Sequence, residues 1–199
     1  MRSLAAWSAV ILAVVLAAAV LTSCAGTSAT VVSADHEHGD VQPAGHNADD
    51  IAFATNMIPH HEQAIELSAL VPDRSGDPQL RTLATAIAAA QGPEIDTMKG
   101  FLAQWDAGTE QADAGHAGHG TAMQGMVDDA TMTRLGRLRG PAFDNLWLES
   151  MISHHQGAIE MAKAEIANGE SANAVALART IVEVQQAEIG QMKQMLAAG

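Results

Sequence analysis

MIPHHEQAIE, at residues 57–66, returns as MISHHQGAIE at residues 151–160. The same spacing of 94 residues brings residues 87–102 onto residues 181–196, where Ile, Gln, Glu, Ile, Met, Lys and Leu recur in the same order. A single ungapped offset over such a length indicates an internal duplication. We therefore expect one structural unit that is built twice.

Each copy has the pattern of two amphipathic helices joined by a short turn. Asp77-Pro78 is typical of a helix start and Asn168-Gly169 of a helix end, while Pro93 predicts a kink. The predicted long helices span residues 48–70, 78–105, 141–167 and 171–197, with a short helix near 129–138. Two such hairpins predict an all-α fold, a four-helix bundle.

The composition favours helices and argues against a nucleic-acid-binding protein. Aromatic residues make up 3% of the chain and Tyr is absent, whereas β-sheets are rich in aromatic and β-branched side chains. The formal net charge is -13, which repels nucleic acid and attracts cations. The chain also shows no Ser/His/Asp order, phosphate-binding loop or Cys nucleophile that would indicate a hydrolase or transferase.

The first 23 residues have the features of a signal peptide. Arg2 precedes the uncharged apolar run Leu4–Leu21, and Leu-Thr-Ser-Cys at residues 21–24 resembles the lipobox of bacterial lipoproteins, in which the Cys is lipidated. Cys24 is the sole cysteine, so an internal disulfide is excluded. An uncleaved membrane helix is the alternative. We expect an exported protein, anchored to the membrane outside the cytoplasm through Cys24.

Two stretches rich in Gly, Ala and polar residues lack an apolar period and are predicted to be flexible. The expected order is a signal peptide (1–23), a tether (24–47) and a bundle (48–199), itself made of hairpin one (48–106), a linker (107–127) and hairpin two (128–199). The tether and linker carry residues able to capture metal from solution, unless they are merely solvated: His36, His38, His46, His116, His119, Met123 and Met126.

Both copies place methionine and histidine on the core face of their first helix. Met57 lies three and four residues before His60 and His61, so the three side chains can meet. The second copy repeats them as Met151, His154 and His155.

The second helix of each copy carries polar residues within an apolar stripe. Gln91 and Glu94 share this face with Met98, and a buried carboxylate needs a partner or a metal ion. The second copy repeats them as Gln185, Glu188 and Met192. Thioether and imidazole ligands suit Cu(I), whereas carboxylates suit harder ions. The simpler interpretation is that the methionines fill the core and the histidines are hydrogen-bonded.

The doubled motif, Met-Ile-x-His-His-x-x-Ala-Ile-Glu followed by Gln-x-x-Glu-Ile-x-x-Met-Lys, resembles the signature of domain-of-unknown-function family 305 over residues 49–105 and 128–197. The resemblance implies a ferritin-like four-helix bundle and, for some exported members, copper binding and tolerance. It implies metal ligands at Met57, His60, His61, Met98, Met151, His154, His155 and Met192. Pro59 and Pro93 have no counterpart in the second copy, so the first hairpin is expected to bend and bind differently.

These features predict a surface-tethered copper-binding protein that sequesters or transfers the ion without catalysis. Glu94 and Glu188 are further candidate ligands. One alternative is a ferritin-like di-metal oxidase, although the required Glu-x-x-His motif is absent and Glu66 and Glu160 lie opposite the motif methionines. Another is a structural or partner-binding lipoprotein. The metal, the number of sites and homo-oligomer formation stay open.

Overall fold

The computed structural model describes residues 45–107 and 124–198, so the expected leader, Cys24 and most of the tether and linker lie outside the described residues. The described chain forms helices and no strand: α1 (Ala48–Arg74), α2 (Pro78–Gln104), α3 (Asp129–Arg137), α4 (Pro141–Asn168) and α5 (Ala172–Ala198). The prediction of an all-α fold is confirmed. In these two ranges, no helix combines the length and the apolar character needed to cross a membrane.

Side-chain caps begin the helices close to where the sequence predicts. The Asn47 side chain accepts the backbone N–H groups of Asp49 and Asp50. The Asp50 carboxylate in turn accepts the N–H of Asn47, which completes a capping box. The Asp77 side chain accepts the N–H groups of Gln79 and Leu80 at the start of α2, without a capping box, and Pro78 follows, whose missing N–H is not needed in a first turn.

The prolines do not end the helices. α1 continues through Pro72 to Arg74 instead of stopping near residue 70, and Pro59 and Pro93 also lie inside continuous helices. A proline leaves the carbonyl four residues earlier without its helical N–H. At Pro93 that carbonyl belongs to Ala89, and both residues are exposed, so water can take the place of the missing donor.

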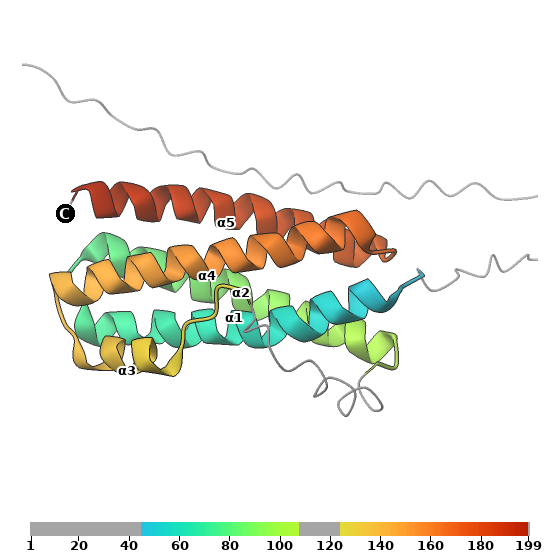
Figure 1. Ribbon diagram of the computed structural model, residues 1–199, viewed down its shortest axis with the longest axis horizontal. Helices are drawn as coiled ribbons and strands as arrows, with labels where there is room; N and C mark the ends of the chain where they lie inside the picture. The colour runs from blue at the N-terminus through green and yellow to red at the C-terminus, as the bar shows by residue number, and fades with distance from the viewer. Residues whose placement is uncertain (1–44, 108–123, 199) are drawn as a thin grey trace, which may run out of the picture. The chain divides into compact units, whose positions relative to one another are not determined.

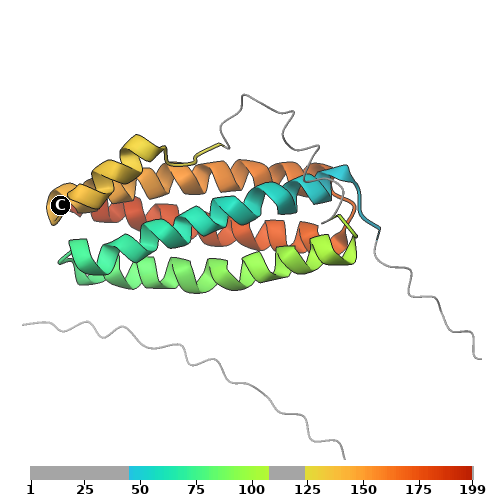
Figure 2. The ribbon, with the colours of Figure 1, turned by 90° about the horizontal axis from the view of Figure 1, so that it is seen from below.

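The four long helices lie side by side as two hairpins (Figures 1 and 2). α1 packs mainly against α2 and α4 against α5, and the hairpins meet chiefly through α1 and α4. These two helices are antiparallel. The Asn47 side chain donates to the Asn168 carbonyl at one end, and the Gly140 N–H donates to the Arg74 carbonyl at the other, each over 2.8 Å. The predicted bundle of two duplicated hairpins is confirmed.

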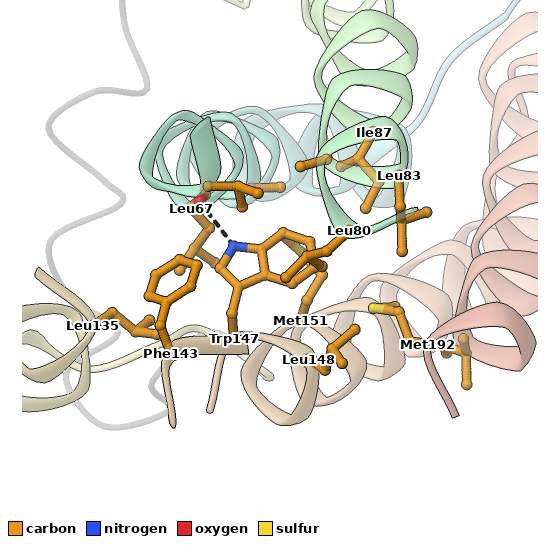
Figure 3. Packing of buried hydrophobic residues seen from close by; sticks show 14 of the residues in the cluster. Leu67, Leu80, Leu83, Ile87, Leu135, Phe143, Trp147, Leu148, Met151 and Met192 are labelled. Carbon is orange, nitrogen blue, oxygen red and sulfur yellow. Dashed lines mark hydrogen bonds between the residues drawn. The ribbon is translucent and has the colours of Figure 1, made fainter. Parts of the chain in front are cut away.

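Two hydrophobic clusters fill the bundle, one in each half of its length. The larger cluster surrounds Trp147, whose indole N–H donates to the Leu67 carbonyl over 2.8 Å (Figure 3). α3 adds the buried Leu135 to this cluster. The smaller cluster contains Phe53, the counterpart of Trp147 in the repeat. The two clusters leave the middle of α1 and α4 to polar side chains.

Candidate metal centre

Four histidines lie in the middle of the bundle, between the two hydrophobic clusters. His60 and His61 belong to α1 and His154 and His155 to α4, and all four are fully buried. The rings of His60 and His154 meet across the α1–α4 interface, with centroids 3.7 Å apart and planes at 37°. These two residues are equivalent in the repeat, so the duplication itself creates the pair. We call the four residues the histidine layer.

Two members of the histidine layer are hydrogen-bonded to a glutamate of their own hairpin. His61 Nε2 lies 2.7 Å from Glu94 Oε2, and the repeat places His155 Nε2 at the same distance from an oxygen of Glu188. The glutamate side chains are 15% and 13% exposed. Each ring N–H donates to a carboxylate, which leaves Nδ1 buried and without a partner in the described residues. The sequence predicted that the carboxylates of Glu94 and Glu188 need a partner or a metal ion, and in the structure that partner is a histidine.

The other two histidines differ from each other. His60 Nε2 donates to the main-chain carbonyl of Gln124 over 3.3 Å, while neither ring nitrogen of His154 has a partner within the described ranges. Burial, reinforced by neighbouring histidines, lowers the pKa of His60 to about 3 and that of His154 to about 2. Both rings are therefore neutral near pH 7, and a neutral imidazole keeps the lone pair that a metal ion requires.

Methionine pairs flank the histidine layer on both sides. Met57 and Met98 lie in the smaller cluster, and Met151 and Met192 lie in the larger one, where Figure 3 shows them among core leucines. All four are fully buried. Each pair joins the two helices of one hairpin, so every predicted methionine ligand faces the interior.

The donor set that results is soft or borderline and shielded from water. Five imidazole nitrogens of the histidine layer are buried without a partner in the described part of the chain. In that same part, no three His, Cys, Asp or Glu side chains converge closely enough to hold an ion. A metal site at this place would therefore need thioether sulfur together with imidazole nitrogen, a combination that suits Cu(I).

The remaining candidates lie elsewhere. Glu66 and Glu160 are exposed, as the helical wheel predicts. His46 stacks on Trp105 at the far end of α2, with ring centroids 5.1 Å apart, and Met126 is half-buried. Five predicted metal-capturing residues lie outside the described residues: His36, His38, His116, His119 and Met123.

Sequence reasoning missed one contributor to this centre, the main chain at Gln124. A carbonyl carries no side-chain signature, so its contact with His60 is invisible in a motif. The one available signal was a difference between the two copies, Gln63 in the first and Gly157 in the second, because both positions contact the segment that contains Gln124.

The profile of the family described as "Domain of unknown function (DUF305)" matches residues 50–196. A DUF305 protein from Streptomyces coelicolor has a similar structure, with 37% identity, a TM-score of 0.69 and coverage of 75% of this chain and 93% of that chain. A DUF305 fragment from Deinococcus radiodurans is 28% identical, with a TM-score of 0.67 and coverage of 77% and 99%.

The protein CopM in its Cu(I)-bound form is also similar, at 30% identity and a TM-score of 0.61, with coverage of 75% of this chain and 96% of that chain. CopM structures with Cu(II) and with Ag match as well. Protein L153 of Acanthamoeba polyphaga mimivirus is 41% identical over 54 residues, which are 27% of this chain and 36% of the viral protein. The match of the profile to residues 50–196 confirms the resemblance: this chain belongs to the DUF305 family.

Proposed function

We propose that this protein binds Cu(I) at the centre of its bundle and stores or transfers the ion outside the cytoplasm, without catalysing a reaction. One observation carries the proposal: five imidazole nitrogens that have no partner among the described residues lie between two pairs of buried methionines. A buried polar atom without a partner costs free energy, and a bound ion would remove that cost. The Cu(I)-bound and silver-bound structures of CopM support a soft ion.

In this proposal the ligands are the thioethers and imidazoles of the doubled motif. They are Met57, His60, His61, Met98, Met151, His154, His155 and Met192. Glu94 and Glu188 act instead as partners that orient the imidazole rings of His61 and His155, as carboxylates do behind many metal-bound histidines. This role explains why an apolar stripe contains a carboxylate in both copies.

Methionine is a suitable ligand for an exported protein. A thioether neither titrates nor forms disulfides, whereas a thiolate outside the cytoplasm is prone to oxidation. The single cysteine, Cys24, is assigned to the lipid anchor, and a tether of residues 25–47 would separate that anchor from the bundle. A similar structure belongs to a protein assigned as secreted, which supports a location outside the cytoplasm.

The alternative of a di-metal oxidase has less support. Such a centre uses two Glu-x-x-His motifs and two further glutamates as oxygen ligands. Glu94 and Glu188 are hydrogen-bonded to histidines, and Glu66 and Glu160 face the solvent. Two of these four glutamates are thus engaged by histidines and the other two lie away from the histidine layer.

Cu(I) competition titrations on two matched variants test the proposal. Changing Met57, Met98, Met151 and Met192 together to Leu should abolish tight Cu(I) binding. Leu has nearly the volume of Met, so each change should lower the free energy of unfolding by less than about 1.5 kcal/mol. The bundle should therefore stay folded. The control changes Met132 and Met195 to Leu, since these residues only border the larger cluster, and should keep the affinity.

A second variant separates soft from hard metal chemistry. Changing Glu94 and Glu188 to Gln should retain most of the Cu(I) affinity, because an amide still accepts the ring N–H. If the centre holds iron or manganese instead, this variant should lose binding while the four-Leu variant keeps it, because hard ions depend on carboxylate oxygen. Undiminished Cu(I) affinity in the four-Leu variant would contradict the copper proposal.

A further inference from the structure

The segment Gln124–Val127, which we call the strap, crosses the α1–α4 seam beside the histidine layer. At one end the Gln124 carbonyl accepts the ring N–H of His60 over 3.3 Å. At the other end the Gln63 side chain donates to the Val127 carbonyl and accepts the Val127 N–H, each over 2.8 Å. The strap is therefore clamped to α1 by main-chain atoms at both of its ends.

On the α4 side the strap lies directly against a glycine. A Cβ atom on Gly157 would stand 1.7 Å from the Gln124 carbonyl oxygen, so no other residue fits there without displacing the strap. Gly125 has φ of +84°, and a Cβ on it would stand 2.5 Å from the Ser153 carbonyl oxygen. Main chain touches main chain here, which only glycine permits.

These contacts account for a local departure from the internal repeat. Gln63 and Gly157 are the seventh residues of the two motif copies and therefore occupy equivalent positions in the repeat. One copy carries the side chain that clamps the strap, and the other carries no side chain, so that the strap fits. Gly92 and Gly190 also lie inside long helices, yet both have open space where a Cβ would be. Among these three helical glycines, only Gly157 leaves space that another segment occupies.

A surface hollow of about 240 Å³ opens beside the strap. It is lined by Gln124 and Gly125 of the strap and by Ser153, Gln156 and Glu160 of α4, together with Gly157. His154, which follows the lining residue Ser153 in α4, is fully buried and belongs to the histidine layer. The hollow has polar lining residues and lies next to the one member of the histidine layer that has no hydrogen bond in the described residues.

We propose that this hollow is the entrance by which a metal ion reaches the histidine layer, and that the strap is its cover. In the closed state the Gln124 carbonyl positions the His60 ring, with Nε2 donating and Nδ1 free. The strap is held by three hydrogen bonds and the partly buried Val127, so its release disrupts far less than unfolding of a helix. The inference rests on the proposed function only for the identity of the ion.

Two glycine substitutions test the cover in the metal-free protein. Gly157→Ala places a methyl group where the Gln124 oxygen lies and should release the strap, while Gly190→Ala is a matched helix control with open space. Modification of His60 and His154 by diethyl pyrocarbonate, followed by peptide mass spectrometry, measures their accessibility. We expect modification about tenfold faster in Gly157→Ala, as for a local opening eased by about 1.4 kcal/mol, and unchanged in Gly190→Ala.

A second variant tests the same proposal in case Gly157→Ala does not fold. Gln63→Leu removes the clamp without adding atoms against the strap and should also speed the modification. Protection of both histidines at the wild-type level in the folded forms of these variants would overturn the proposal. In the Cu(I)-loaded protein, Gly157→Ala should also speed transfer to a chelator. If the wild type takes up no Cu(I), the proposed function fails, while the metal-free measurement still decides whether the strap is a cover.

Discussion

Replacing Glu165 by Gln is expected to make the stability of the bundle less dependent on pH. Glu165, in the last turn of α4, lies beside Asp50 in the first turn of α1, and their exposed fractions are 1% and 0%. The Asp50 carboxylate accepts three main-chain N–H groups, from Asn47, Glu170 and Ser171. Two carboxyl groups therefore share one buried site that already supplies donors to only one of them.

This environment shifts the pKa values of the two carboxyl groups in opposite directions. Burial raises the pKa of Glu165 to about 8, and the neighbouring Asp50 carboxylate acts in the same sense. Burial alone would raise the pKa of Asp50, but the main-chain hydrogen bonds from Asn47, Ser171 and Glu170 lower it overall. Near neutral pH the pair is thus a carboxylic acid, Glu165, beside a carboxylate, Asp50.

The sign of the pH effect follows from the proton count. Between pH 4.5, the ordinary pKa of Glu, and about 8, Glu165 holds a proton in the folded chain but not in the unfolded one. The free energy of unfolding therefore falls as pH rises through this interval, by roughly 1 kcal/mol per pH unit, or a few kcal/mol in all. Glu165→Gln should match the wild type in stability at the acidic end and exceed it by a few kcal/mol near pH 8, because an amide stays neutral throughout this interval.

Urea unfolding followed by circular dichroism, repeated at several pH values in this interval, measures the effect. Glu160→Gln is the control, since Glu160 lies on the same helix and pairs with Lys163, with both side chains more than half exposed. Such a surface ion pair contributes little to the free energy of unfolding, so the pH profile of the control should follow that of the wild type. Parallel pH profiles of Glu165→Gln and the wild type would refute the reasoning, because they would mean that Glu165 titrates alike in the folded and unfolded chains.

Three further predictions concern the anchor, the tether and the core. Cys24→Ser should block lipidation, and a variant that fractionates with membranes and migrates like the wild type would contradict the anchor. Deleting residues 25–46 should lower the number of bound Cu(I) ions but keep the tightest site, because ordering a Gly- and Ala-rich segment costs conformational entropy. If a titration shows that the tightest site is lost, the tether and not the bundle contains its ligands. Trp147→Phe removes the N–H donated to Leu67 and should cost about 1–3 kcal/mol in urea unfolding. Unchanged stability would show that this bond contributes nothing.

Much of the fold could be predicted because helical signals are local. The duplication predicted two equivalent hairpins, and caps such as Asp77-Pro78 gave helix starts within a residue or so. The spacing of Met57, His60 and His61 put these residues on one buried face, because residues three and four apart are neighbours on any helix. The end of α1 was predicted too early, since Pro72 is tolerated in its last turn.

The candidate ligands could likewise be identified residue by residue, but their arrangement could not. The sequence suggested one set of ligands in each hairpin and a partner or metal for Glu94. The structure gives Glu94 a histidine partner and brings His60 against His154 from the other hairpin. The ligand roles of all these residues stay predictions for the titrations above.

The contacts between the two copies of the repeat were decided by the tertiary structure alone. The meeting of His60 and His154 depends on the antiparallel register of α1 and α4, and the closeness of Gln124 depends on where the strap crosses them. Periodicity fixes which side of a helix a residue occupies, whereas the register between helices is set by packing of their surfaces. The amino-acid sequence therefore determined which residues face the interior, and the packing of α1 on α4 determined which of them meet.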